Sequence, residues 1–208
     1  MVIRGQSERR AGTRGVPRAV REQRILDVAG QAFSERGYHA ASMERIAAGA
    51  GVTKPVVYAY FGSKEGLYAA YVEREGRELI ARMRGATDTS VDPAERLRAG
   101  TMQFLGFVAE RRDGWQLLYA EAAARGGPAA EQIAQLRARI VAMVRRLLAA
   151  ETVSPGQEAV LDALAHAFVG AGESLANWWL TRPEVPSEEV AGLLLASARA
   201  AVQQAVAA

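Results

Sequence analysis

A short stretch near the N-terminus offers side chains with the chemistry needed to read a nucleic-acid groove. It supplies a hydroxyl, an ammonium, an apolar contact and a phenol, from Thr53, Lys54, Val56 and Tyr58. Such groups match the donors, acceptors and methyl groups that base edges present in the major groove of DNA. Lys54 is the candidate for guanine, and Val56 for a thymine methyl. Helical spacing would turn these side chains outward while Val57 turns the opposite way.

Two short helices joined by a tight turn would hold this segment in place. Ser42 predicts the N-cap of the first helix, and Gly51 stands at the turn, because glycine reaches positive φ without steric cost. Thr53 predicts the N-cap of the second helix, and Pro55 is tolerated in its first turn, where the missing N–H has no helical partner. Residues 42–64 therefore predict a helix-turn-helix, whose second helix enters the major groove.

These residues resemble the DNA-binding domain of the TetR family of bacterial transcriptional regulators. The resemblance covers roughly residues 18–70 and rests on Ile46-Ala47, Ala50-Gly51-Val52-Thr53, Tyr58-Ala59-Tyr60-Phe61 and Ser63-Lys64-Glu65-Gly66-Leu67. The chain departs from the family at Tyr60, where His is usual, and at Pro55, where Gly is common. The resemblance implies an all-α fold, with an N-terminal helix-turn-helix domain followed by a helical ligand-binding and dimerisation domain.

The resemblance also implies a function. It is that of a ligand-responsive repressor, which binds a palindromic operator in double-stranded DNA as a homodimer and is released by a small hydrophobic or amphipathic effector. The DNA-binding residues expected are Arg18, Ser42, Thr53, Lys54, Pro55, Val56, Tyr58, Tyr60 and Lys64. No catalytic residue, metal or cofactor is expected, because no nucleophile motif, metal-ligand spacing or phosphate loop is present. Three alternatives stay open: an activator, a ligand-independent architectural protein, and an all-α apolar-ligand carrier or enzyme with an incidental basic face.

The charge is uneven along the chain. Residues 1–64 hold eleven Lys and Arg against five Asp and Glu, a net charge of +6. Residues 65–208 hold fifteen against eighteen, a net charge of −3. A basic excess beside the turn motif favours a polyanion as partner. The alternative is an ordinary solvated surface.

Composition indicates a helical protein of the cytoplasm. The 208 residues include no cysteine, and the N-terminus has no apolar segment of the kind that signal peptides carry. The longest apolar run, around residues 159–181, is interrupted by Asp162 and Glu173, so no membrane span is expected. We expect a disordered basic arm in 1–17, the helix-turn-helix domain in 18–64, a connecting helix in 65–84, and the ligand-binding and dimerisation domain in 85–208.

Periodicity and capping signals predict the remaining helices. The first runs from Arg18 to about Arg36 and ends at Gly37. Asp92, Pro93 and Glu95 form a start signal for a helix that Asp113 and Gly114 break. Further helices are expected around Trp115, from Pro128, from Ser154-Pro155 to about Thr181, and from Ser187 to Ala205.

Apolar and aromatic residues in the second domain would line an effector pocket. The candidates are Met102, Phe104, Phe107, Trp115, Leu118, Tyr119, Met143, Leu147, His166, Phe168, Asn177 and Trp178. Few charged groups occur among them, which favours a hydrophobic or amphipathic ligand. Plain core packing is the alternative for each residue.

A polar stripe marks the same region. Asp162, His166, Glu173 and Asn177 share one helical face, and three readings stay open for it: solvent, the dimer interface and the pocket. The homodimer itself is expected through residues 155–208, by resemblance, with Leu194 and Ala198 as contact positions.

Overall fold

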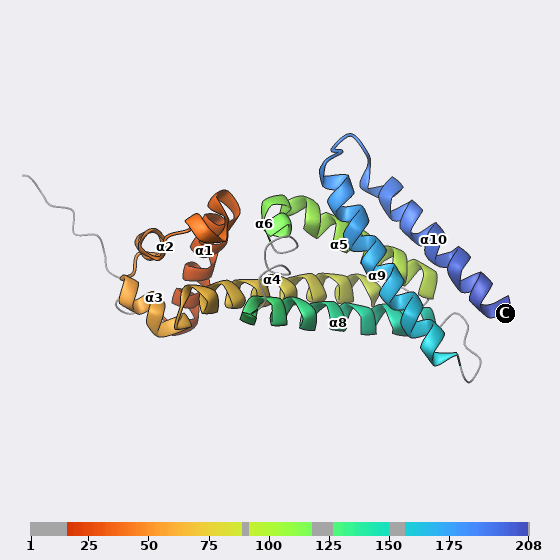
Figure 1. The fold of residues 1–208 in the computed structure, drawn as a ribbon, viewed down its shortest axis with the longest axis horizontal. Helices are drawn as coiled ribbons and strands as arrows, with labels where there is room; N and C mark the ends of the chain where they lie inside the picture. Colours follow the sequence, from red (N-terminus) through yellow and green to blue (C-terminus); the bar gives the residue numbers. More distant parts are fainter. Residues whose placement is uncertain (1–15, 89–91, 118–126, 150–156, 208) are drawn as a thin grey trace, which may run out of the picture. The chain divides into compact units, whose positions relative to one another are not determined.

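The computed structural model describes residues 16–88, 92–117, 127–149 and 157–207. Every regular element in these ranges is an α-helix (Figure 1), so the predicted all-α class is confirmed. The chain divides into two compact units, Met1–Tyr68 and Ala69–Ala208. The predicted arm lies outside the described residues except for its last two positions, and so does the predicted helix start at Ser154-Pro155.

The first unit contains α1 (Arg18–Ala40), α2 (Met43–Ala50), α3 (Lys54–Phe61) and the first turn of α4 (Lys64–Thr87). Each helix contributes apolar side chains to one core. Ile25, Phe33, Ile46, Val57 and Leu67 are completely buried there. This core explains why a helix as short as α3 is stable, since packing rather than intrinsic propensity supplies most helical stability in proteins.

Helix α1 extends further than predicted. Gly37 breaks its geometry, with φ 72° and ψ 166°, but helical residues resume and continue to Ala40. The extra turn places Tyr38 against two aromatic rings, 6.0 Å from Phe33 and 5.1 Å from Tyr68 between ring centroids. The predicted glycine break is therefore present, and tertiary contacts hold the chain in a helix beyond it.

The start of α4 is fixed by a close approach of backbone to backbone. A Cβ atom on Gly66 would lie 2.0 Å from the carbonyl oxygen of Phe61. Ser63 accepts a hydrogen bond from the Gly66 N–H through Oγ, at 2.9 Å. Glycine is therefore the residue that lets α4 begin directly after α3.

The second unit contains the rest of α4, with α5 (Pro93–Glu110), α6 (Arg112–Leu117), α8 (Gly127–Ala149), α9 (Glu158–Leu180) and α10 (Ser187–Ala207). Helix α9 packs against α8 and α10, and α10 also packs against α5. Helices α4 and α8 lie side by side (Figure 1), and a Cβ on Gly76 would touch Leu136 at 3.1 Å.

Two helix boundaries in this unit can be compared with those predicted from capping signals. Asp92 caps α5 as predicted, and its Oδ1 accepts from the Ala94 N–H at 3.1 Å. The predicted break at Asp113 and Gly114 is wrong, because α5 ends at its C-cap Arg111 and α6 begins at the next residue. Arg111 has non-helical dihedral angles, with φ −124° and ψ 39°. Asp113 and Gly114 therefore belong to the new helix that starts after it.

By length and composition, α9 could cross a bilayer, with a mean hydropathy of 1.2 over an 18-residue window. Packing within the described residues accounts for part of that composition, since 28% of the window is buried. The residues that α9 buries against neighbouring helices are Leu161, Ala165, Val169, Gly172, Ala176 and Leu180. The same test is met by core helices of water-soluble proteins, so it is weak support for a membrane span.

A cluster of opposite charges joins α4 to the end of α5. Arg111 Nη1 lies 2.6 Å from Oε2 of Glu75, an ion pair whose angles fall outside those of a hydrogen bond. Its Nη2 lies 2.7 Å from Oε2 of Glu78, and Arg74 Nη2 lies 3.0 Å from Oε1 of Glu75. Glu75 is only 1% exposed, so these cations replace the water that its carboxylate has lost.

Glu78 shares this cluster with Arg82. Partial burial opposes ionisation of Glu78, but hydrogen bonds and charges from Arg82 and Arg111 outweigh it and hold the pKa below its ordinary value. Because the folded pKa lies below the unfolded one, the resulting stabilisation is present at neutral pH. This stabilisation is lost as the pH falls from the ordinary pKa of a glutamate through the lower pKa of Glu78 in the folded state.

Replacing Arg111 with Ala should destabilise the second unit by about 3 kcal/mol, the lower end for breaking a buried ion pair, because Arg74 remains beside Glu75. Urea denaturation at neutral pH measures the loss. Arg98→Ala is the matched control, because the Arg98–Glu95 pair is exposed and its side chains are 54% and 43% accessible. Such pairs contribute about 0–1 kcal/mol. Equal losses in the two variants would show that Glu75 does not depend on Arg111.

Candidate nucleic-acid interface and ligand cavity

Helices α2 and α3 are joined by the tight turn that the sequence predicts. Ser42 is the N-cap of α2 and accepts the Arg45 N–H through Oγ at 3.4 Å. Gly51 ends α2 in the left-handed region, with φ 70° and ψ 28°. Thr53 is the N-cap of α3, but its hydroxyl makes no capping hydrogen bond. The two helices therefore form a helix-turn-helix in which the Thr53 side chain is not engaged by its own helix.

Helix α3 has one buried side and one accessible side. Val57 is completely buried, whereas Tyr58 is 40% exposed. Thr53, Lys54 and Pro55 are also exposed, and Val56 is partly exposed. The side chains predicted for base contacts thus lie on the accessible part of α3, as groove reading by a recognition helix requires.

Lys54 is engaged by a neighbour on α2. Its Nζ donates a hydrogen bond to Oε1 of Glu44, and Ser42 Oγ donates to the other carboxylate oxygen at 2.9 Å. The hydrogen bond from Lys54, then one from backbone and one from Ser42, lower the pKa of Glu44 from 4.5 to about 2. Both side chains are accessible to solvent. A negative charge that sequence reasoning did not weigh therefore stands on the candidate DNA-binding face.

Arg18, Arg21 and Tyr60 gather where α1 meets the end of α3. The Arg18 guanidinium lies 5.1 Å from the centroid of the Tyr60 ring. Arg21 Nη1 donates to the Tyr60 hydroxyl at 3.3 Å. Tyr60, in place of the usual His, thus sits beside two cations, a setting suited to a phosphate group.

Lys64 makes contacts with α1 inside the first unit. Its ammonium donates to the carbonyl oxygen of His39 at 2.9 Å and lies 4.8 Å from the centroid of the Tyr38 ring. Lys64 therefore ties the start of α4 to the end of α1. A contact to phosphate would have to share these donors, and sequence reasoning gave no sign of this use.

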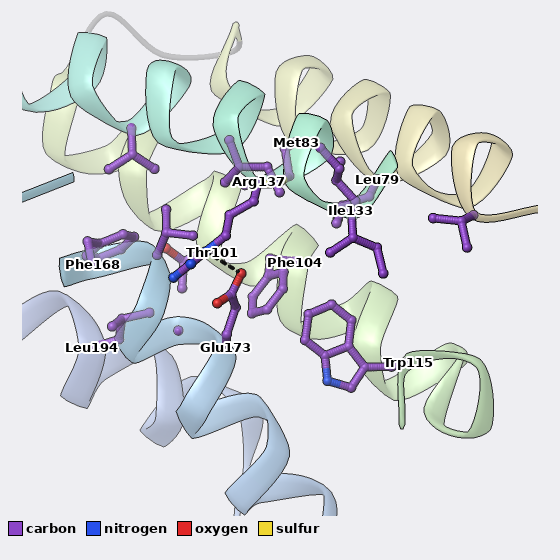
Figure 2. Close-up of a pocket in the computed structure, with 16 residues that line it drawn as sticks. Leu79, Met83, Thr101, Phe104, Trp115, Ile133, Arg137, Phe168, Glu173 and Leu194 are labelled. Carbon is purple, nitrogen blue, oxygen red and sulfur yellow. Dashed lines mark ion pairs between the residues drawn. The ribbon is translucent and has the colours of Figure 1, made fainter. Parts of the chain in front are cut away.

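The second unit contains a partly open apolar cavity of about 90 Å³. Its walls come from α4, α5, α6, α8, α9 and α10, and Figure 2 shows how the side chains converge. Three of the predicted pocket residues line it: Phe104, Trp115 and Phe168. The Phe104 and Trp115 rings meet edge to face, with centroids 5.4 Å apart.

The cavity has one charged pair in its wall. Arg137 Nε, from α8, lies 3.2 Å from Oε1 of Glu173, from α9 (Figure 2). The Glu173 side chain is 19% exposed, whereas that of Arg137 is 46% exposed. Burial raises the pKa of Glu173, while the nearby Arg137 opposes that rise.

The other predicted pocket residues lie elsewhere. Phe107, Met143 and Leu147 are buried in the core, and Met102 packs against it. His166 and Trp178 are exposed. Asn177 accepts a hydrogen bond from Nε1 of Trp115 at 3.0 Å, so it positions a wall residue instead of lining the cavity. Leu118 and Tyr119 lie outside the described residues.

Sequence reasoning missed the walls from α4 and much of α8. Val72, Leu79 and Met83 of α4 line the cavity, as do Ile133 and Leu136 of α8. Helical spacing of apolar residues was the available signal: the α4 residues lie in a segment predicted only as a connecting helix, and the α8 residues lie in the predicted ligand-binding domain but were not chosen as pocket residues.

The polar stripe divides between two environments. Asp162 and His166 are exposed and lie 3.7 Å apart. Glu173 lines the cavity, and Asn177 holds Trp115. The pocket reading therefore applies to Glu173, whereas Asp162 and His166 are exposed on the single chain, where solvent and a dimer interface both stay open.

A helix-turn-helix with an accessible second helix, followed by a larger helical unit, is typical of helix-turn-helix transcription regulators. A family model described as "Bacterial regulatory proteins, tetR family" matches residues 25–71. Another, described as "Tetracyclin repressor-like, C-terminal domain", matches residues 93–201. The chain belongs to the TetR family of transcriptional regulators, which confirms the resemblance stated above.

Named relatives agree with this assignment. The HTH-type transcriptional activator FasR of Mycolicibacterium smegmatis is 41% identical over 110 residues, 53% of this chain and 50% of that protein. The HTH-type transcriptional repressor KstR2 of Mycobacterium tuberculosis is 35% identical over 78 residues, 38% of this chain and 39% of that protein. The chain thus spans half the length of these curated relatives, or less.

A solved structure extends the likeness over both units. The crystal structure of a TetR-like transcriptional regulator from a Rhodococcus species is 37% identical to this chain, with a TM-score of 0.71. The match covers 88% of this chain and 96% of that one.

Replacing Glu44 with Gln should strengthen binding to DNA of any sequence several-fold. The change removes a negative charge beside the phosphates and frees Lys54 to replace counterions. The salt dependence should steepen by about one unit for each subunit. Fluorescence anisotropy with operator and scrambled duplexes at several salt concentrations measures both effects.

Two variants control this prediction. Glu35→Gln removes the same charge from an exposed position of α1, where the carboxylate only accepts from Gln31. Lys54→Ala combined with Glu44→Gln tests whether Glu44 acts through Lys54, in which case the gain should shrink in the double variant. A gain of the same size in Glu35→Gln would reduce the Glu44 effect to net charge.

Proposed function

We propose that the protein is a cytoplasmic, ligand-responsive repressor that binds a palindromic operator as a homodimer and leaves it when a small hydrophobic or amphipathic effector binds. One observation gives the main support for this proposal. Helix α4 begins in the unit that holds the helix-turn-helix and supplies Val72, Leu79 and Met83 to the cavity wall of the other unit. A ligand in the cavity would therefore touch the helix that leads into the DNA-reading unit.

The DNA contacts follow from the accessible part of α3. Thr53, Lys54, Pro55, Val56 and Tyr58 would enter the major groove, where side chains of these types distinguish base pairs. Arg18, Ser42, Tyr60 and Lys64 would approach the phosphates and set the register. The domains of the proposal are a basic arm in 1–17, a reading domain in 18–64, a connecting helix in 65–84, and an effector and dimerisation domain in 85–208.

The direction of regulation is part of the proposal. One named relative is an activator and another is a repressor, so similarity alone supports both. We choose repression because release by an effector needs only that the ligand disfavour the DNA-bound form. The matches are to transcription regulators, and they do not favour the carrier or enzyme alternative.

The dimer would form through α9 and α10. Large apolar side chains are exposed on both helices: Leu193 by 57%, Val160 by 42% and Trp178 by 37%. A shallow apolar groove runs between the helices, bordered by small residues such as Ala167, Ala171 and Ala201. Exposed apolar surface of this kind favours a protein partner, and a second copy supplies the second half-site reader.

Leu194 is turned inward in the single chain, although it also borders the groove between α9 and α10. Its side chain is 3% exposed, lines the cavity and would touch a Cβ placed on Gly172 at 3.3 Å. The close approach of α9 and α10 buries most of Leu194, so it would contribute little surface to the proposed interface. Ala198 is partly exposed and remains a candidate contact.

Replacing Leu193 with Glu should give monomers with native helix content, because a charge would be buried in an apolar contact without a partner. The monomers should lose palindrome binding. Sedimentation velocity and circular dichroism measure these two properties. Val20→Glu is the matched control, since Val20 is 55% exposed on α1 and should leave the dimer intact. Dimers that persist in Leu193→Glu would place the interface elsewhere.

Induction would work through spacing. Two reading heads must sit about 34–36 Å apart to enter successive major grooves on one face of the duplex. An effector that prefers a mis-spaced arrangement a hundredfold supplies about 2.7 kcal/mol against DNA binding. Linkage requires the reciprocal effect, so operator DNA must weaken effector binding by the same factor.

The test begins by selecting genomic fragments with the purified protein, which yields the operator. A library of hydrophobic metabolites is then titrated with and without operator DNA, and tryptophan fluorescence reports binding because Trp115 lines the cavity. We expect a ligand whose affinity falls when operator is present. A ligand that quenches Trp115 yet binds equally well in both titrations would contradict the induction model. Failure to enrich any sequence would contradict DNA recognition itself.

A further inference from the structure

The cavity wall holds a carboxylate and a guanidinium that differ in how freely they can move. Glu173 is 19% exposed and Arg137 is 46% exposed. The main chain at Glu173 is further held by Asn177, whose Nδ2 donates to the Glu173 carbonyl oxygen at 2.9 Å. Arg137 can therefore turn its charged end into water on a flexible stem, whereas Glu173 stays in the wall.

A departure of Arg137 would leave a partly buried negative charge among apolar groups. Burial already raises the pKa of Glu173, so the carboxylate needs a replacement cation more than an exposed carboxylate would. An anionic ligand in the place of Arg137 would be unfavourable, because it would bring a second negative charge beside Glu173. A neutral apolar ligand would leave the ion pair as it is.

The remaining wall suits the same kind of ligand. Phe104, Trp115 and Phe168 supply aromatic rings, and ring faces attract organic cations. Thr101 is also in the wall, but its hydroxyl donates to the Leu97 carbonyl at 2.8 Å, so it has only acceptor capacity left. Once Arg137 has turned into water, the polar side chains left in the described wall are Glu173 and Thr101, and both then accept hydrogen bonds (Figure 2).

We propose that the cavity binds lipophilic amines, with the ligand's ammonium group replacing Arg137 on Glu173 and its apolar body against the aromatic wall. This rests on the proposed function in one respect: the amine would be the effector that the DNA-binding form disfavours. The binding itself requires no DNA, so the two claims can be tested apart.

The experiment uses the full chain and three ten-carbon probes: decylammonium, decanol and decanoate, each below its micelle-forming concentration. Calorimetry measures affinity, and a change in tryptophan fluorescence that is lost in Trp115→Phe confirms that the probe reaches Trp115. We expect the ammonium to bind at least about tenfold more tightly than decanoate, because only the former forms a charge-assisted contact with Glu173. Tighter binding of decanoate would overturn the proposal.

Two variants make opposite predictions for a cation and for an anion. Glu173→Gln keeps the size of the side chain and should reduce ammonium affinity about tenfold while leaving decanol unchanged. Arg137→Ala removes the competing cation and should increase ammonium affinity, whereas an anion-binding cavity would lose affinity for decanoate. Arg139→Ala, on the same helix but not in the cavity wall, should change neither. Weaker ammonium binding in Arg137→Ala would contradict the exchange of partners even if Glu173→Gln failed to fold.

Operator binding in the presence of each probe separates the two claims. Ammonium that binds and weakens the operator complex supports both. Ammonium that binds without affecting DNA binding supports the ligand class but contradicts its role as effector. Decanoate that releases DNA while the ammonium does not would retain the proposed function and overturn the amine.

Discussion

Helix α4 has to serve two cores with one amphipathic surface. Its first turns bury Leu67 and Tyr68 in the reading unit, and later turns present Val72, Leu79 and Met83 to the cavity. An α-helix turns through a fixed angle at each residue, so both sets of apolar side chains must recur at helical spacing within this one element. The close backbone approach at Gly66 fixes where this helix starts. A shift in its rotation would therefore disturb both units.

The buried carboxylate of Glu75 restricts how α4 can pack against the other helices of the second unit. An apolar residue there could pack against several neighbours, but a charge that is 1% exposed is tolerated only beside Arg74 and Arg111. Buried ion pairs add little net stability compared with apolar packing, and a role in fixing register is their best-attested use. We therefore interpret the cluster as a restraint on how α4 meets the end of α5.

Local signals predicted the parts of the structure that depend on neighbouring residues. Gly51 and Asp92 could be read from the sequence because a positive φ and an N-cap are set within a few positions. The position of Leu194 could not, because α10 carries apolar residues on more than one face and only its approach to Gly172 decides which turn inward. The Glu173–Arg137 pair joins residues 36 positions apart, which no periodicity connects. For the same reason, the stripe divided between the cavity, at Glu173, and the exposed surface, at Asp162.

The free energy that induction requires is of the size that a few apolar contacts in the cavity can supply. A hundredfold shift in operator affinity corresponds to about 2.7 kcal/mol, and burying one methylene group contributes about 0.8 kcal/mol. A ligand that makes three or four more methylene contacts in one arrangement of α4 than in another would supply that difference. Val72, Leu79 and Met83 offer such contacts along one side of the cavity, while Glu173 lies on α9. A ligand held at Glu173 and extending toward α4 would thus sense the position of the helix that enters the reading unit, because its tail gains or loses contacts as α4 moves.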